Sequence, residues 1–386
     1  GPRAPARPVS AAVTSAFRRS PAPKRGFVRA DQLHLLPAGI VSGELALAAV
    51  IGGQGWPIAD GPLAFTSVGV IWREDGENWI ALLSFAELST WAEGESEDVA
   101  RSVGRWVRRV GAARPDWAGL SMDRPRLMGI VNVTPDSFSD GGRNLAADTA
   151  VANALAMVAA GADIIDVGGE STRPGAVPVP MEEEINRVVP VIRALAERGV
   201  VVSVDTRHAP VMRAALAAGA KIINDVTALE GEGGLAVAAE SGAAVILMHM
   251  RGQPRTMQAD PRYECAPLEV YDYLAGRVAV CEAAGISRHR LMVDPGIGFG
   301  KTAVHNAQIL ATLPLLHGLG CPVLLAASRK TFIGHLSKGE PPPQRLAGTI
   351  AAHQMGLNAG VQLIRVHDGD EAAQALAVWR AISSAG

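Results

Sequence analysis

Polar and ionisable side chains recur at the ends of short apolar runs from residue 126 onward. These positions hold Asn132, Asp166, Asp205, Asn224, His249, Asp294, Arg329, Lys330, Arg365 and His367. The carboxylates of Asp205 and Asp294 and the amide of Asn224 can pair with the polar edge of an aminopyrimidinone ring. Burying that edge without partners would cost several kcal/mol, so such pairing would also give selectivity.

Other members of this set suit phosphate chemistry. Arg365 and His367 are two residues apart at one strand end, so both can face the same side and bind a phosphate. Asn132 offers a neutral oxygen for a Mg²⁺ ion that keeps waters and substrate phosphate oxygens. One such residue alone is more often a helix cap, and Arg365 could instead pair with an acid across the site. The whole set predicts a site for an anionic, heteroaromatic molecule.

The elements that must position these residues alternate regularly. Eight apolar runs alternate with Ala-rich stretches of helical spacing, and the runs lie at 127–131, 163–167, 200–204, 221–224, 244–248, 291–293, 322–327 and 362–366. Continuous apolar strands between helices indicate a parallel sheet covered on both faces. Eight such units over about 260 residues favour an α/β fold of the (β/α)8 TIM barrel type, whose active site lies at the carboxyl ends of the strands.

Two long loops follow the first two predicted strands. The stretch 131–142, VNVTPDSFSDGG, carries one aromatic ring, Phe138, among turn-forming residues, and 168–176 is rich in Gly, Pro and hydroxyls. Neighbouring long loops over a barrel mouth often form a lid that excludes water, although two merely solvated loops would have the same composition.

The glycine-rich stretch DPGIGFGKT, 294–302, resembles a nucleotide-binding phosphate loop only superficially. The spacing between its first glycine and the Gly-Lys-Thr end is one residue too short. We expect a turn that lets Phe299 lie against a flat ligand, with a core position as the alternative for this ring.

The first third of the chain has a different composition. Residues 1–32 form a Pro-, Ala- and Arg-rich segment that we expect to be disordered, and an acid-free start of this kind could also be a transit peptide. Residues 33–120 hold six of the seven tryptophans, a predicted hairpin around the turn 73–78 and a predicted helix at 96–113. They predict an N-terminal extension or small α+β lobe of unknown role, and packing or an interface is the simplest role. The barrel takes residues 121–386.

Overall composition excludes several classes of protein. A formal net charge of −2 argues against a nucleic-acid binder. The longest uncharged stretch, 302–328, is interrupted by prolines and polar residues, so no membrane association is expected. Three cysteines fit neither a disulfide framework nor a metal motif and suit a reducing compartment, so a cytoplasmic location is expected, with organelle targeting by residues 1–30 left open.

A series of motifs then gives a family resemblance. LMGIVNVTPDSFSDGG, GADIIDVGGESTRPGA, VVSVDT, IIND, LMHM, LMVDPGIGFGK, SRKTFIG and LIRVHD resemble, in order and spacing across residues 122–386, the motifs of dihydropteroate synthase. The resemblance implies that 4-aminobenzoate displaces diphosphate from 7,8-dihydropterin-6-ylmethyl diphosphate to give 7,8-dihydropteroate in folate biosynthesis. It also implies Mg²⁺ as cofactor, a homodimer and sensitivity to sulfonamides.

The resemblance also implies a role for each matched residue. Catalysis is assigned to Asp205, Lys330, Phe138 and Asp140. The pterin site comprises Asp205, Asn224, Met248, Asp294, Phe299, Lys330 and Arg365. The diphosphate site comprises Asn132, Thr172, Arg365 and His367, with Asn132 also the metal ligand. The aminobenzoate site comprises Phe138, Thr172, Arg173, Pro174 and Thr331.

Two other functions share part of this pattern. A pterin-binding methyltransferase has a barrel and part of the pterin site, but it would not need the corner at Lys330 and Thr331 or the Phe138 loop. A non-catalytic pterin-binding barrel would keep the ligand without turning it over. An assay for diphosphate release on mixing the two substrates distinguishes a synthase from both of these alternatives, because only a synthase would release it.

Overall fold

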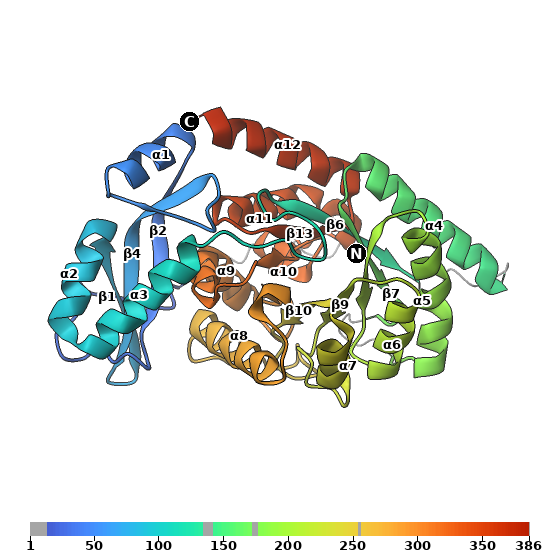
Figure 1. Cartoon of the computed structure of the whole chain (residues 1–386), viewed down its shortest axis with the longest axis horizontal. Coiled ribbons are helices and arrows are strands. Elements are labelled where there is room, and N and C mark those ends of the chain that lie inside the picture. The colour runs from blue at the N-terminus through green and yellow to red at the C-terminus, as the bar shows by residue number, and fades with distance from the viewer. Residues whose placement is uncertain (1–13, 134–141, 172–176, 254–255, 386) are drawn as a thin grey trace, which may run out of the picture.

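The computed structural model describes residues 14–133, 142–171, 177–253 and 256–385. Two parts pack side by side: an N-terminal lobe and a barrel (Figure 1). The predicted residues Phe138, Asp140, Thr172, Arg173 and Pro174 lie outside the described ranges.

The lobe is built on a five-stranded sheet. Its strands are β1 (Arg18–Arg19), β2 (His34–Ser42), β3 (Trp56–Pro57), β4 (Leu63–Glu74) and β5 (Glu77–Ser84), in the order β1-β5-β4-β2 with β3 also paired to β4. Helices α1 (Gly43–Ile51), α2 (Phe85–Glu95) and α3 (Glu97–Gly111) complete it. The expected hairpin and helix are both confirmed. Asp75 and Gly76, which both have positive φ, make the two-residue turn between β4 and β5.

One expectation for the N-terminal segment is wrong. Residues 14–32 were expected to be disordered, but β1 pairs in parallel with β5, and Phe17 and Val28 are buried. The reason is that an apolar surface was available elsewhere in the fold. Phe17 packs with Ile71, Cys265, Leu268 and Leu315, so two aliphatic side chains of the barrel complete a contact that the local composition could not supply.

The barrel strands are β6 (Arg126–Asn132), β7 (Ile164–Gly168), β8 (Val201–Asp205), β9 (Ile222–Asp225), β10 (Ala244–Met248), β11 (Leu291–Asp294), β12 (Leu324–Leu325) and β13 (Leu363–Val366). All pair in parallel, in the order β11-β10-β9-β8-β7-β6-β13-β12, and a parallel bridge between Val293 and Val323 joins the two ends of the sheet. The predicted (β/α)8 barrel is confirmed, although the predicted strand 322–327 is only two residues long.

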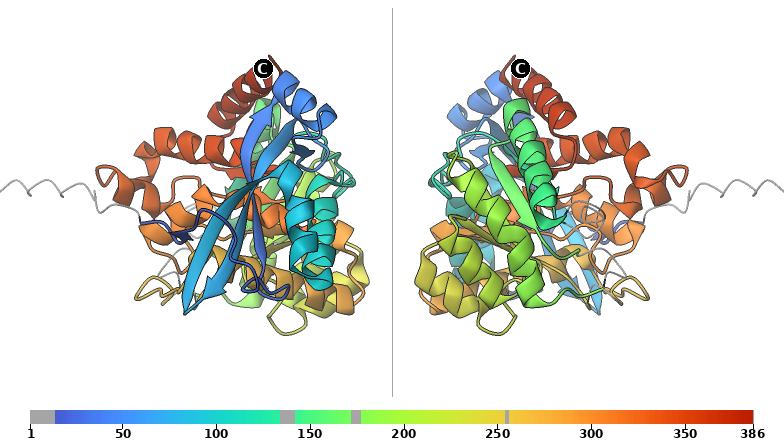
Figure 2. Two further views of the ribbon diagram at one scale, coloured as in Figure 1. Left: turned by 90° about the vertical axis from the view of Figure 1, so that its left-hand side faces the viewer. Right: turned by 90° about the vertical axis from the view of Figure 1, so that its right-hand side faces the viewer.

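Helices surround this ring of strands (Figures 1 and 2). They are α4 (Gly142–Ala160), α5 (Met181–Ala196), α6 (Ala209–Ala217), α7 (Gly234–Ser241), α8 (Ala266–Ala283), α9 (Ala303–Ala311), α10 (Thr331–Leu336), α11 (Leu346–Asn358) and α12 (Gly369–Ala385). Short 3-10 helices are η2 (Arg288–Arg290), η3 (Leu313–Leu319) and η4 (Pro342–Gln344). Within the described residues, no helix is both long enough and apolar enough to span a bilayer.

Side chains of alternate residues fill the barrel interior in layers. The lower, apolar layer contains Met128, Ile164, Ile222, Ile246, Met292, Leu324 and Leu363. Trp117, at the amino-terminal end of the strands, joins this cluster and donates its indole N–H to the carbonyl of Arg290 at 3.1 Å. Because side chains on a strand alternate between faces, residues two positions later point inward one layer higher. The same phase therefore brings Asp166, Asn224, Asp294 and Arg365 to the carboxyl-end opening of the barrel, which we call the mouth.

The lobe packs through both faces of its sheet. One face carries Phe65, Val68, Val70 and Trp72, which pack with side chains of α2 and α3 that include Leu88 and Trp106. The other face presents Ile71 to Cys265, Leu268 and Leu315 of the barrel. His34 adds a 2.7 Å contact to Asp272, and α1 lies beside α12 (Figure 2). Trp56, Trp72 and Trp106 pack in the lobe and Trp117 packs under the barrel, so the tryptophan-rich composition of 33–120 reflects packing.

Candidate active site

A buried network of charges lies at the centre of the mouth. Arg365 donates from Nε to Asp166 Oδ2 at 2.7 Å and from Nη2 to Asp205 Oδ2 at 3.0 Å. Asn224 Nδ2 donates to the same Asp166 oxygen at 2.9 Å. These residues come from β7, β8, β9 and β13. Arg365 therefore pairs with acids across the barrel, and its predicted contact with a phosphate stays a prediction.

The two carboxylates of this network retain acceptor capacity. Asp166 Oδ1 and Asp205 Oδ1 are buried and have no hydrogen-bond partner in the described part of the chain. Burial, and after it the neighbouring Asp166 carboxylate, raise the pKa of Asp205 to about 7 against the lowering effect of Arg365. Buried acceptors without donors are costly, so these atoms suit a ligand that brings its own N–H groups.

The opposite side of the mouth places a cation beside an aromatic ring. Lys330 Nζ donates to the carbonyl of Ile297 and lies 4.7 Å from the centroid of the Phe299 ring. Burial lowers the pKa of Lys330 to about 8, while Asp294 opposes that shift. Burial also raises the pKa of Asp294, whose Oδ1 accepts from the backbone N–H of Gly296 at 2.7 Å. Met248, next to Asp294 in the sheet register, is buried as well.

A buried lysine that the sequence reasoning did not assign holds the glycine-rich turn. Lys301 Nζ donates to the carbonyls of Gly296 at 2.9 Å, Phe299 at 3.0 Å and His249 at 3.3 Å, and it lies 2.9 Å from His249 Nδ1. The lysine is almost fully buried, and this burial lowers its pKa well below the ordinary value. Three convergent carbonyls replace its lost hydration, so Lys301 has a structural role in the turn and not the phosphate-binding role of a phosphate loop.

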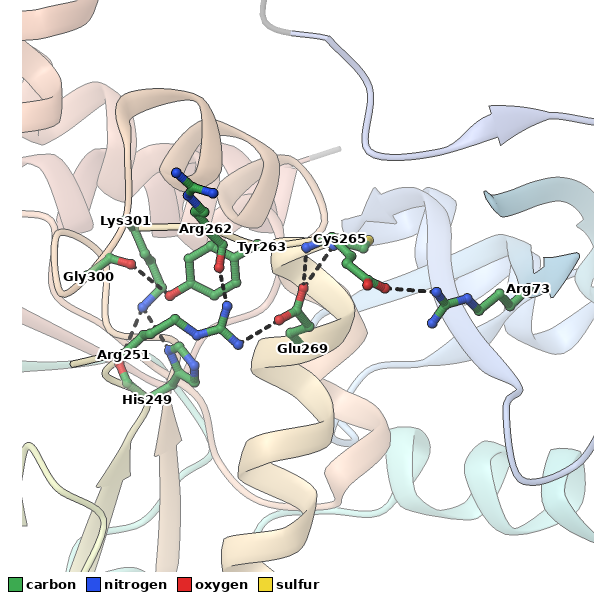
Figure 3. A network of polar contacts seen from close by, with 10 residues as sticks. Arg73, His249, Arg251, Arg262, Tyr263, Cys265, Glu269, Gly300 and Lys301 are labelled. Atoms are coloured by element: carbon green, nitrogen blue, oxygen red, sulfur yellow. Dashed lines mark hydrogen bonds and ion pairs between the residues drawn. The ribbon is translucent and has the colours of Figure 1, made fainter. Parts of the chain in front are cut away.

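The turn is braced from outside by further side chains, shown in Figure 3. Tyr263 donates its hydroxyl to the carbonyl of Gly300 at 2.8 Å, and the Arg251 guanidinium lies 4.2 Å from the Tyr263 ring centroid. Arg251 also binds Glu269 at 2.7 Å, and that carboxylate accepts from the backbone N–H groups of Glu264 and Cys265. Arg73 of the lobe reaches Glu264 at 2.8 Å, which connects the N-terminal extension to this network (Figure 3).

Asn132 and His367, two of the residues expected to bind phosphate, lie on the remaining side of the mouth. An added Cβ on Gly168 would lie at ordinary contact distance from both side chains, 3.5 Å from Asn132 Oδ1 and 3.7 Å from Asp205 Oδ2, so Gly168 lies beside both of them. His367 lies just after β13, with its Nδ1 2.9 Å from Ser328 Oγ. Asn132 and His367 border a hollow of about 400 Å³ between β6, α4 and the start of α12.

The structure therefore brings together the described residues that the sequence predicted. Asp205, Asn224, Met248, Asp294, Phe299, Lys330, Arg365, Asn132 and His367 all lie at the carboxyl ends of the barrel strands or in the loops that follow them. Thr331 lies exposed at the first position of α10, next to Lys330. Asp166 was noted in the sequence only as a residue at a strand end, and its central role was missed. Two signals in the sequence were available. Asp166 lies within the apolar run 163–167, and it is two residues before Gly168, which puts both on the same face of the strand.

Comparison with known proteins decides the family. The family model described as pterin binding enzyme matches residues 128–367. The dihydropteroate synthase of Escherichia coli K12 is 48% identical over 267 residues, which cover 69% of this chain and 94% of that protein. The chain belongs to the dihydropteroate synthase family. It is a transferase of folate biosynthesis, and residues 14–120 lie outside the matched model.

Solved structures of the same family superimpose on the barrel. The dihydropteroate synthase of Xanthomonas albilineans with 4-aminobenzoic acid matches with a TM-score of 0.65 and 50% identity, covering 69% of this chain and 97% of that one. The same enzyme in complex with 7,8-dihydropteroate matches with a TM-score of 0.63 and 47% identity over the same share of this chain, covering 96% of that one. The Yersinia pestis synthase in a sulfonamide drug complex matches with a TM-score of 0.65 and 46% identity, covering 69% of this chain and 96% of that one.

Proposed function

We propose that this chain condenses 7,8-dihydropterin-6-ylmethyl diphosphate with 4-aminobenzoate to give 7,8-dihydropteroate and diphosphate. The observation that carries the proposal is the convergence of Asp205, Asn224, Asp294 and Lys330 on one barrel mouth. Carboxylates and an amide suit the aminopyrimidinone edge of a pterin, while Lys330 can donate to its carbonyl oxygen. Phe299 and the planar Arg365 guanidinium suit the two ring faces.

In the proposed reaction the bond between the methylene carbon and the diphosphate oxygen breaks, and the bond electrons leave with diphosphate. The amine nitrogen of 4-aminobenzoate forms the new bond to the same carbon and then loses a proton. A methylene cation formed in this way must be shielded from water. We propose that the two loops after β6 and β7 provide that shield, with Phe138 against the arene and Asp140 balancing charge. Thr172, Arg173, Pro174 and Thr331 would complete the aminobenzoate site.

Release of diphosphate needs positive charge near its oxygens. Arg365 and His367 lie on β13 and just after it, where they can face diphosphate oxygens, and Thr172 would add a hydroxyl. Among the described residues there is no cluster of three His, Cys, Asp or Glu that could hold a metal ion. The exposed Asn132 would instead hold Mg²⁺ through its amide oxygen, together with waters and diphosphate oxygens, since this ion keeps much of its hydration shell. When bound, Mg²⁺ would neutralise charge on the leaving diphosphate.

The test is to mix both substrates with Mg²⁺ and follow release of diphosphate and formation of dihydropteroate. Turnover that needs 4-aminobenzoate supports the proposal, and pterin binding without diphosphate release would indicate a non-catalytic barrel. Transfer of a methyl group from a methyl-pterin to a corrinoid would indicate the methyltransferase alternative. Sulfamethoxazole should compete with 4-aminobenzoate. Inhibition that excess 4-aminobenzoate does not relieve would contradict the predicted competition.

A homodimer in the cytoplasm completes the proposal. Large apolar side chains are exposed on neighbouring helices: Leu45 and Ile51 on α1, and Val378 and Ile382 on α12. Such a grouping suits a surface that a second copy covers. The three described cysteines are free and buried, which suits a reducing compartment. Light scattering on the purified chain gives the oligomeric state, and Ile382→Glu should shift a dimer toward monomers.

A further inference from the structure

A cluster of arginines lies at the junction of the lobe and the barrel, at the end opposite the mouth. Helix α3 packs against η3 at this boundary. Arg105, Arg108, Arg109 and Arg114, from α3 and the segment that follows it, line an open hollow of about 330 Å³ with Arg288, His289 and Gly320. Arg288 and His289 directly precede β11, and Gly320 precedes β12, so the hollow opens at the amino-terminal end of the strands. We call it the arginine hollow.

The arginine hollow contains more positive charge than its own carboxylates neutralise. Arg288 is paired with Glu282, through contacts of 2.9 and 2.8 Å. Within the described ranges, Arg105, Arg108, Arg109 and Arg114 have no carboxylate partner. Burial lowers the pKa of Arg109, and the neighbouring charges of Arg288 and Arg105 lower it further. Like charges gathered in this way are unfavourable unless an anion joins them.

Arg114 also lines the hollow, and its buried side chain has incomplete hydrogen bonding. Its side chain is 7% exposed, and burial lowers its pKa to about 10. Nη1 donates to the carbonyls of Arg109 and Ala112 at 2.8 Å each, which caps the last turn of α3. Nε and Nη2 are buried without an acceptor in the described part of the chain. Capping accounts for one nitrogen of Arg114 but not for the three arginines that α3 directs to the same hollow.

We propose that the arginine hollow is a second ligand site, distinct from the mouth, which binds a small multivalent anion of the phosphate class. Guanidinium groups bind phosphate oxygens through paired N–H donors, and several of them together favour a diphosphate group over a monovalent anion. The volume is at the lower end of the range for small-molecule sites, so it suits a phosphorylated small molecule or a free diphosphate.

The experiment is a calorimetric titration of the full chain with inorganic diphosphate at about 0.15 M ionic strength, where loose surface attraction is screened. The double variant Arg105→Gln/Arg109→Gln should lose one molar equivalent of bound diphosphate, or bind it at least tenfold more weakly, with unchanged turnover. Arg198→Gln, an exposed arginine on another part of the barrel, is the matched control and should bind as the wild type does. Equal titrations of wild type and double variant would overturn the proposal.

Two further arms make the result decisive. A titration with ADP distinguishes a phosphorylated metabolite from free diphosphate as the natural ligand. If the double variant loses a binding site for ADP as well as for diphosphate, a phosphorylated metabolite is indicated. If it loses only the site for diphosphate, the free anion is indicated. The second arm is a titration with a single-stranded oligonucleotide. If the oligonucleotide binds through these arginines and neither small anion does, the small-ligand proposal is overturned in favour of a polyanionic partner. Should the double variant fail to fold, the exposed Arg108→Glu must weaken diphosphate binding by itself, or the proposal fails.

Discussion

Arg365 and Asp166 are 199 residues apart in the chain, yet Arg365 Nε lies 2.7 Å from Asp166 Oδ2 at the barrel mouth. Asp166 is fully buried and also accepts from Asn224, so one carboxylate orients two of the proposed pterin-binding residues. The sequence motifs predict specific roles for both of those residues but none for the aspartate between them.

Asp166→Asn tests this relationship. The variant leaves Arg365 with only Asp205 as a charged partner, and removing one member of a buried pair typically costs on the order of 3 kcal/mol of stability. We expect unfolding in urea at lower concentration and pterin binding at least tenfold weaker. Asp123→Asn, at an exposed aspartate 3.7 Å from Arg126, is the control and should change neither quantity measurably. Wild-type pterin affinity in Asp166→Asn would contradict the positioning role.

The raised pKa of Asp205 predicts how pterin binding depends on pH. With the pKa near 7, the ionised carboxylate that would accept pterin N–H groups becomes scarce in acid. The dissociation constant for a dihydropterin should therefore rise, approaching roughly tenfold per pH unit well below pH 7. Titrations between about pH 5 and pH 8 measure this. Asp205→Asn should bind more weakly with a flattened profile, and a flat profile in the wild type would refute the assignment.

The same group predicts a pH dependence of stability. Its pKa in the folded state lies above the ordinary value of 3.8, so the folded protein holds this proton more tightly than the unfolded chain. The stabilisation is fully present below about pH 4 and is lost as the pH rises through about 7. Burial raises the pKa of Asp294 and Asp225 as well, so stability should decline in both proteins. Urea unfolding across this window should show a steeper decline in the wild type than in Asp205→Asn, and parallel curves would exclude a contribution from Asp205.

Lys301→Met tests the buried lysine behind the glycine-rich turn. Methionine has a similar length but cannot donate, so the carbonyls of Gly296, Phe299 and His249 lose a shared donor. We expect a loss of about 2 kcal/mol or more in the free energy of unfolding and at least tenfold weaker pterin binding. Lys338→Met, at an exposed lysine, controls for loss of charge. Unchanged pterin binding with reduced stability would restrict Lys301 to a general folding role.

Ile71→Ala tests whether the lobe and the barrel stabilise each other. Ile71 is fully buried and packs with Phe17, Cys265, Leu268 and Leu315 at their boundary, so the truncation should cost about 2–5 kcal/mol. Leu82→Ala, at a side chain that is 61% exposed and lies outside the proposed dimer surface, should have little effect. Thermal unfolding should show one cooperative transition shifted to lower temperature by Ile71→Ala. A separate early transition of the lobe alone would show that the two parts unfold independently.

The sequence by itself determined the barrel and most of the described residues at its mouth. Apolar runs of strand length between helices can only be buried in a covered parallel sheet, and the polar residue at the end of each run then has to lie at the same rim. The hairpin at Asp75 and Gly76 could also be predicted from the sequence, because its turn needs two residues that tolerate positive φ.

The tertiary structure alone decided three things. The first is the position of residues 14–32 on the lobe. Phe17 packs against Leu268 and Leu315, which are about 250 and 300 residues away in the sequence. The tertiary structure also gave Lys301 three carbonyl partners and Asp166 an arginine partner, which depend on how loops and strands meet in space. It also gathered Arg105, Arg109 and Arg288 beside one hollow. Local patterns encode which face a side chain takes, but pairing between distant segments is fixed only when the chain packs.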